Sequence, residues 1–222
     1  MKTQFSQLAL CRELETFDPA DLASVQAAFS ELEEYPLQQA WLPEPEPDFL
    51  PAVAKLGWRG NSLLIFAQLT DGDIFTRATT HNQRFWELGD TFEMFLRPVG
   101  QKSYVEFHVT PTNLRLQLRF ADDNCIVSAR QKGAFQEMLV SEPQFQSHAW
   151  IRTDSARWYA LAEIPAGAVV EKPRTLAGSR WMFSLCRYEY VRSRKLPVIS
   201  STSAHTVPDF HRQDQWSELH FI

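Results

Sequence analysis

Three consecutive runs of this chain alternate apolar and polar residues at every second position, and this pattern constrains the fold more than any other feature. The runs cover residues 91–97, 103–110 and 113–120. Successive side chains of a β-strand point to opposite faces, so each run predicts a strand with one apolar face. In an antiparallel sheet the three apolar faces must lie on the same side, toward a core.

Further runs of strand type are separated by turn-forming residues and occupy residues 52–58, 63–69, 135–140, 149–153, 158–164, 180–190 and 216–222. Many short strands at such spacing are typical of sandwiches and barrels. We therefore predict an all-β fold, an antiparallel immunoglobulin-like β-sandwich with a short N-terminal helical or irregular segment. A length of 222 residues suits one such domain.

The N-terminal part of the chain differs from the rest. Asp18 fits the N-cap of a helix, with a proline at its first position. Apolar residues follow at helical spacing, and Pro36 ends the pattern. A proline-rich stretch at residues 41–47 then predicts an extended connection. Because only a short segment precedes it, we expect residues 1–48 to form a helix and an extended proline-rich segment that both pack on the β-sandwich. Residues 1–222 would then form a single domain.

Composition excludes several classes of protein. The net charge of −5 disfavours a general nucleic-acid binder. The sequence also lacks a polybasic patch, which would have indicated membrane binding. The three cysteines fit neither a disulfide framework nor a zinc site, because they are odd in number and far apart. The apolar run at residues 8–11 is too short for a signal peptide. The sequence as given predicts a cytoplasmic protein, secreted only if a leader has been removed, and leaves the oligomeric state open.

The polar faces of the three alternating runs can be placed side by side. In the first hairpin, Glu93 opposite His108 keeps like charges apart. If Pro111 and Thr112 form a two-residue turn, His108 pairs with Arg115 in the second hairpin. The next rows are then Phe95, Glu106 and Gln117, followed by Arg97, Tyr104 and Arg119. Such a face is either a solvated sheet surface or a binding surface for a ligand rich in hydroxyl groups.

An ordered series of motifs resembles the carbohydrate-binding modules of family 9. Residues 86–96, WELGDTFEMFL, resemble the family's Trp…Asp-x-Val-Glu-Ile/Val-Phe-Leu/Ile signature. Further segments resemble other strands of the same family, in order residues 63–71, 104–111, 158–165 and 210–221. The resemblance implies a β-sandwich related to the wider DOMON group. It also implies non-catalytic binding of a small saccharide or oligosaccharide between two aromatic rings.

The resemblance also implies particular site residues. Trp86 matches the first stacking aromatic residue, and Glu93 matches the acid that contacts the sugar. His108 falls where such modules carry an arginine, and Phe210 falls near the second stacking tryptophan. The predicted ligand-binding residues are Trp86, Glu93, His108, Arg115, Phe210 and His211.

Two alternative uses of acidic residues remain open. Asp71 and Asp73 flank a glycine and could supply oxygen ligands to calcium, which some relatives bind, although Asp-Gly is first of all a turn. Glu93 and Glu106 could serve a glycosidase, which needs two carboxylates about 5 to 9.5 Å apart. No sequence feature marks either acid as catalytic, so we predict that the protein is not an enzyme.

Two alternative functions keep the fold without the sugar. Some DOMON relatives bind haem through axial side chains, and Met94, Met138 and Met182 are candidates for that role here. Haem ligation requires two such groups that face one cavity. The other alternative is an interaction or sensory domain that binds no saccharide.

Overall fold

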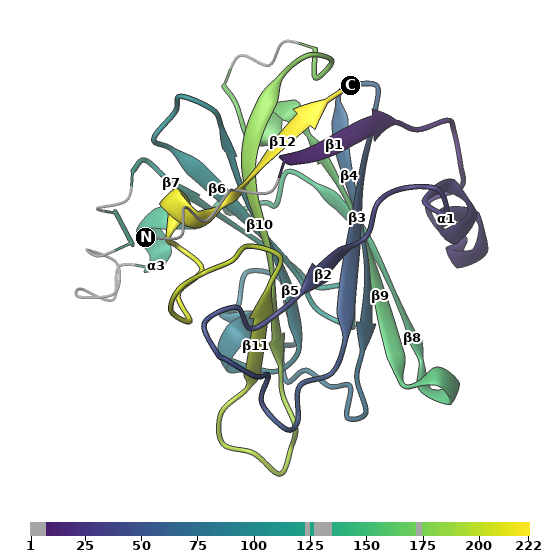
Figure 1. The fold of residues 1–222 in the computed structure, drawn as a ribbon, viewed down its shortest axis with the longest axis vertical. Coiled ribbons are helices and arrows are strands. Elements are labelled where there is room, and N and C mark those ends of the chain that lie inside the picture. The colour runs from purple at the N-terminus through teal and green to yellow at the C-terminus, as the bar shows by residue number, and fades with distance from the viewer. Residues whose placement is uncertain (1–7, 123–124, 127–134, 172–174) are drawn as a thin grey trace.

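The structure is a computed structural model that describes residues 8–122, 125–126, 135–171 and 175–222. Two β-sheets lie face to face, which confirms the predicted all-β sandwich (Figure 1). The first sheet contains, in spatial order, β7 (Arg115–Phe120), β6 (Tyr104–Val109), β5 (Thr91–Pro98), β10 (Arg180–Glu189) and β12 (Ser217–Phe221), with β11 (Val198–Ser201) also paired to β10. The second contains β3 (Ala52–Arg59), β4 (Ser62–Thr70), β9 (Arg157–Pro165) and β8 (Gln146–Arg152), with β2 (Tyr35–Leu37) paired to β3.

A strand near the N-terminus joins the two sheets. Leu8 to Cys11 of β1 (Leu8–Glu13) pair with β12, and Arg12 and Glu13 pair with β3. Both pairings are parallel, whereas every other strand pairing is antiparallel among the described residues. Neither this strand nor its direction is predicted by the sequence pattern.

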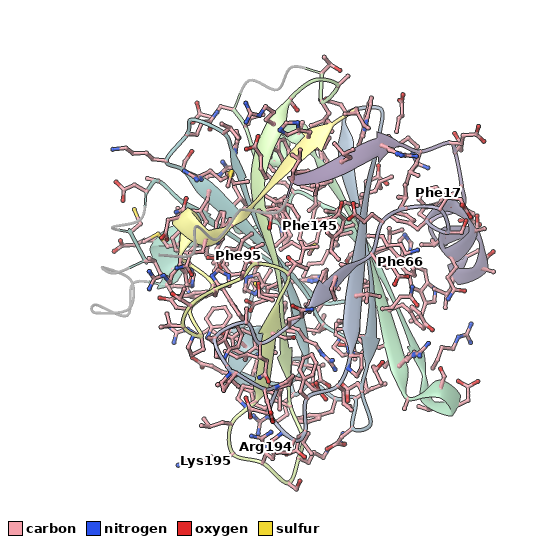
Figure 2. All side chains as sticks on the ribbon, viewed as in Figure 1. Phe17, Phe66, Phe95, Phe145, Arg194 and Lys195 are labelled. Atoms are coloured by element: carbon pink, nitrogen blue, oxygen red, sulfur yellow. The ribbon has the colours of Figure 1, made fainter. Side chains whose placement is uncertain are left out.

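Three apolar clusters fill the molecule, one between the sheets and one on the outer face of each (Figure 2). Phe145 belongs to the cluster between the sheets, where the predicted apolar faces of β5 and β6 meet the second sheet. Phe95 belongs to the cluster on the outer face of the first sheet. Phe66 belongs to the third cluster, which packs under α1 (Leu22–Ala28). The outer face of the first sheet is therefore not the solvated surface that one interpretation of the sequence predicted.

The N-terminal helix begins three residues later than predicted. Asp21, not Asp18, is the N-cap, and its carboxylate accepts hydrogen bonds from the backbone N–H groups of the first turn. Lys55 of β3 closes the other end, because its ammonium donates to the carbonyl oxygens of Phe29 and Ser30. Cations are favourable at that end of a helix. These contacts fix the helix on the second sheet.

The segment after the helix follows the edge of the sandwich. Pro36 does not end the helix but lies in β2, opposite Val53 of β3. Gln38 forms a backbone bridge with Ser201 of β11. The side-chain amide of Gln39 donates to the carbonyl oxygen of Ile199. The segment thus contacts both sheets.

The predicted strand at residues 135–140 is instead a short helix, α3 (Phe135–Met138). Strand β11, at residues 198–201, was not predicted. The remaining predicted strands are present, with ends that differ by up to three residues.

The register of the first hairpin is confirmed, but that of the second is wrong by one residue. Glu93 lies opposite His108 as predicted. His108 lies opposite Leu116, however, and not opposite Arg115. The turn is longer than two residues, because Asn113 adopts a left-handed conformation with φ of 61°. A shift of one residue moves every side chain of β7 to the other face.

A buried arginine connects the two sheets at one end of the sandwich. Arg187 of β10 is fully buried, and its guanidinium lies 3.3 Å from Asp71 and 3.1 Å from Glu189. It also donates a hydrogen bond of 2.6 Å to the carbonyl oxygen of Thr70 at the end of β4. Burial and the neighbouring Asp71 raise the pKa of Asp90 to about 8. Arg187 therefore supplies the positive charge that offsets the buried carboxylates of Asp71 and Glu189.

We predict that Arg187→Met destabilises the protein by about 3–5 kcal/mol, because it leaves Asp71 and Glu189 buried without their cation. Arg192→Ala is the control, since Arg192 pairs with Asp73 at the surface and such pairs contribute up to about 1 kcal/mol. Urea unfolding of both variants and wild type measures the difference. An equal effect of the two substitutions would contradict the role given to Arg187.

Candidate ligand-binding site

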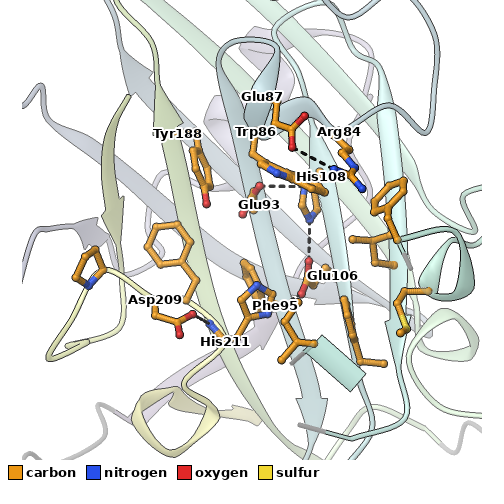
Figure 3. Close-up of a pocket in the computed structure, with 17 residues that line it drawn as sticks. Arg84, Trp86, Glu87, Glu93, Phe95, Glu106, His108, Tyr188, Asp209 and His211 are labelled. Carbon is orange, nitrogen blue, oxygen red and sulfur yellow. Dashed lines mark hydrogen bonds and ion pairs between the residues drawn. The ribbon is translucent and has the colours of Figure 1, made fainter. Parts of the chain in front are cut away.

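A cavity of about 300 Å³ opens on the outer face of the first sheet (Figure 3). Its floor is formed by side chains of β5, β6, β7 and β10, namely Glu93, Phe95, Glu106, His108, Leu118, Phe120 and Tyr188. Its walls come from four segments outside the sheet, at residues 84–87, at Ile126, in α3 and at residues 208–211. The floor residues thus lie on strands of the sheet, and the wall residues lie on segments that pack over those strands.

Trp86 forms an aromatic wall of the cavity. It lies in a short 3-10 turn, η1 (Phe85–Glu87), whose position is fixed by the hydroxyl of Tyr190 donating to the Trp86 carbonyl oxygen. The indole is half-buried, with its ring centroid 5.6 Å from that of His108 and 5.7 Å from that of Phe135. One indole face is therefore held above the charged floor.

Phe210 forms another wall but is much less exposed. Only 4% of the residue is accessible to solvent. Its ring centroid lies 6.2 Å from that of Phe95 and 5.8 Å from that of Tyr188, with the rings near perpendicular. Edge-to-face contacts of this kind are favourable. Phe210 therefore presents a small part of its ring to the cavity.

A chain of buried polar groups crosses the floor (Figure 3). His108 Nδ1 lies 3.0 Å from Glu93 Oε1, and His108 Nε2 lies 3.2 Å from Glu106 Oε2. Glu106 Oε1 lies 3.1 Å from His211 Nδ1, which also contacts the hydroxyl of Tyr104 at 3.1 Å. The side chains of Glu93, Glu106 and His108 are at most 3% exposed. The chain therefore takes several ionisable groups out of water together.

The surroundings of His108 favour its imidazolium form. Its Nε2 is hydrogen-bonded to Glu106, and its Nδ1 lies within ion-pair distance of Glu93. Burial alone would lower the pKa of His108, but the charges of Glu93 and Glu106 outweigh it and raise the pKa to about 9. Burial would likewise raise the pKa of Glu106, yet the neighbouring His211 and His108 lower it to about 2. The floor thus holds separated charges at neutral pH.

The cavity brings together most of the predicted site residues, namely Trp86, Glu93, His108, Phe210 and His211. Arg115 is the exception, because the register of β7 turns it to the other face of the sheet. Its guanidinium donates to the carbonyl oxygen of Phe145, at 2.6 Å, and to the side chain of Gln146. Arg115 therefore does not line the cavity.

Several residues of the cavity were missing from the predicted set, among them Glu106, Tyr188 and Asp209. Glu106 follows from the alternation in β6, which places it on the same face as His108. Tyr188 follows in the same way from β10, once its register against β5 is known. Asp209 lies in an irregular segment next to Phe210, where no periodicity could indicate its direction.

The predicted calcium ligands are engaged elsewhere. Asp71 pairs with the buried Arg187, and Asp73 pairs with Arg192. The backbone N–H of Asp73 donates to Asp71 Oδ1, which is the geometry of an Asp-Gly turn. In the part of the chain that the structure describes, no group of three or more His, Cys, Asp or Glu side chains is arranged to hold a metal. Both predicted ligands are therefore paired with arginines in this structure.

The predicted haem ligands do not face one cavity. Met94 is fully buried in the cluster between the sheets. Met138 lines the cavity on the opposite side of the first sheet, and Met182 packs against the outer cluster without lining that cavity. Axial ligation by a pair of these methionines is therefore incompatible with the fold.

No helix among the described residues has the length and apolar character needed to cross a membrane.

Comparison with known proteins relates the chain to carbohydrate-binding modules by fold. A scan against protein-family models found no match, and neither did a search of curated protein sequences. A solved structure from Bacteroides uniformis, of a protein for which carbohydrate binding has been suggested, is 15% identical with a TM-score of 0.76, covering 98% of this chain and 100% of that one.

Two further structures are of a family 9 carbohydrate-binding module from Caldicellulosiruptor kristjanssonii. The complex with cellotriose is 13% identical with a TM-score of 0.62, covering 97% of this chain and 93% of that one. The complex with glucose is 12% identical with a TM-score of 0.64, covering 97% and 96%. The chain therefore has the β-sandwich fold of family 9 carbohydrate-binding modules, as its motifs implied.

We predict that stability depends on pH through His108. Because its pKa is raised from 6.5 to about 9, its contribution is complete below pH 6.5 and is lost as the pH rises through about 9. The free energy of unfolding, measured in urea, should therefore fall more steeply over this range in wild type than in His108→Gln. Asp90 titrates in the same range, and comparing the two slopes removes its contribution. Equal slopes would contradict an imidazolium at this position.

Proposed function

We propose that this protein binds a mono- or oligosaccharide, without catalysis, in the cavity on the outer face of the first sheet. The observation that carries the proposal is the half-exposed indole of Trp86 held above a row of buried hydrogen-bonding groups. A sugar ring has an apolar face of C–H groups and an edge of hydroxyl groups, so it needs both kinds of surface. The shared fold supports the proposal, since two of the compared structures hold cellotriose and glucose.

The residues of the cavity have distinct roles in this proposal. Trp86 stacks on one face of the sugar ring, and Phe210 limits the space from another wall. Glu93 and Glu106 accept hydrogen bonds from sugar hydroxyls, and charged acceptors form stronger hydrogen bonds than neutral ones. His108 and His211 hold these carboxylates in place. The ligand thus meets groups that are already oriented.

The dimensions of the cavity support a small ligand. A volume of about 300 Å³ lies at the lower end of the range for small-molecule sites. We infer that one sugar ring enters and that any further rings stay outside. Because few contacts would hold the sugar, binding should be modest. We expect a Kd in the micromolar to millimolar range, which is a free energy of binding of roughly −8 to −4 kcal/mol.

The electrostatics favour binding over glycoside hydrolysis. A glycosidase keeps one carboxylic acid protonated by raising its pKa, while a second carboxylate is ionised. Here the pKa of Glu106 is lowered to about 2, and Glu93 faces an imidazolium. Glu106 is therefore held ionised and is not prepared to donate a proton.

We predict saturable heat in isothermal titration calorimetry with at least one of glucose, cellobiose and xylobiose. Trp86→Ala should weaken binding about tenfold or more, as removal of a central aromatic contact commonly does. The matched control is Trp150→Ala, because Trp150 is also half-buried but lies on the second sheet, stacked on His148.

Two outcomes would contradict this proposal. If folded protein gives no heat with any saccharide, the chain keeps the fold as an interaction or sensory domain. If both tryptophan variants bind like wild type, the saccharide binds outside the cavity.

A further inference from the structure

Tyr188 lines the cavity from β10 and is partly exposed there. Cys186 of β10 lies opposite Glu93 of β5, and Tyr188 is the next residue of β10 on the same face. Figure 3 shows Tyr188 on one side of Glu93 and Trp86 on the other, with the Tyr188 hydroxyl directed toward the Glu93 carboxylate. A ligand that covers Glu93 therefore meets both aromatic side chains.

The ring of Tyr188 is held in place by Phe210. The two ring centroids are 5.8 Å apart, and the rings are near perpendicular, which is a favourable contact. Phe210 is itself enclosed, because its ring also contacts those of Trp41, Phe95 and His205. With Phe210 only 4% exposed, Tyr188 is the more accessible of the two to a ligand.

The hydroxyl of Tyr188 is available as a donor. No described residue forms a hydrogen bond with it. Burial and the nearby charge of Glu93 raise the pKa of Tyr188 above its ordinary value, so the phenol keeps its proton at neutral pH. The Tyr188 hydroxyl therefore points into the cavity as a neutral donor.

The carboxylate of Glu93 is available as an acceptor. Glu93 Oε1 is buried and accepts no hydrogen bond from a described residue, although His108 Nδ1 lies 3.0 Å from it. A buried acceptor without a donor is unfavourable. Glu93 and Tyr188 therefore offer a ligand an acceptor and a donor in the same part of the cavity.

We propose that Tyr188 and Glu93 together recognise one unsubstituted hydroxyl group of the bound sugar, which makes Tyr188 a specificity-determining residue. A hydroxyl group is both a donor and an acceptor, so it can accept from Tyr188 and donate to Glu93 at the same time. An alkylated oxygen cannot donate, and a deoxy position can do neither. The inference rests on the proposed saccharide binding and adds which chemical group of the sugar must be free.

Calorimetry of Tyr188→Phe tests the inference, with the tightest-binding sugar among glucose, cellobiose and xylobiose as the probe. The substitution removes the hydroxyl and keeps the ring, so it should weaken binding about three- to tenfold, as loss of one hydrogen bond does. Tyr159→Phe is the matched control, because it makes the same chemical change in the cluster on the second sheet and should leave binding unchanged. Urea unfolding of both variants checks that they are folded.

Monodeoxy derivatives of the same sugar, each lacking one hydroxyl group, separate recognition from a general disturbance of the site. One derivative should bind wild type more weakly than the parent sugar does. Tyr188→Phe should not weaken the binding of that derivative further, because it has no hydroxyl group to accept from Tyr188. The other derivatives should lose affinity in Tyr188→Phe by the same factor as the parent sugar.

The outcomes distinguish this inference from the proposed function. If the parent sugar binds but Tyr188→Phe has no effect, or weakens all derivatives equally, Tyr188 does not recognise a hydroxyl group and the proposed function stands. If none of the three sugars binds to folded protein, the proposed function fails and the inference fails with it.

Discussion

The site depends on the burial of both faces of the first sheet. One face packs against the second sheet, and the other is covered by an outer apolar cluster that includes Phe95 and Trp216. Polar side chains on that outer face therefore lose their water. A buried charge is costly unless it is paired, so Glu93, His108 and Glu106 must satisfy one another. The cavity is the part of this covered face that the covering segments leave open.

The sequence indicates this arrangement where local rules decide it. Strict alternation identified β5 and β6, and avoidance of like charges selected the register in which Glu93 faces His108. The same reasoning failed one hairpin later, because nothing in the sequence required Asn113 to adopt a left-handed conformation. That single residue lengthens the turn and moves Arg115 out of the site. Alternation predicts which residues of a strand share a face, but the length of the turn decides on which face of the sheet they lie.

Features that depend on distant contacts were not predictable in the same way. Strand β1 pairs with strands more than forty residues away, and its short apolar run resembles any other. Phe210 lies in an irregular segment, so only the family resemblance suggested its place. Its burial among Phe95, Tyr188 and Trp41 reflects packing that periodicity cannot describe. Tertiary contacts, and not local propensity, determine these elements.

The low identity to structures of the same fold shows that very different sequences can build this sandwich. The sandwich requires apolar faces of the right size, and many sequences supply them. The outer face of β5 and β6 has a second requirement, because any charge placed there must be compensated within the face. Exchanging a paired set such as Glu93, His108 and Glu106 for another paired set would alter the field in the cavity without disturbing the core. Substitutions at positions 93, 106 and 108 could therefore change which ligand the cavity accepts. The charges at these positions bear more directly on function than the fold does.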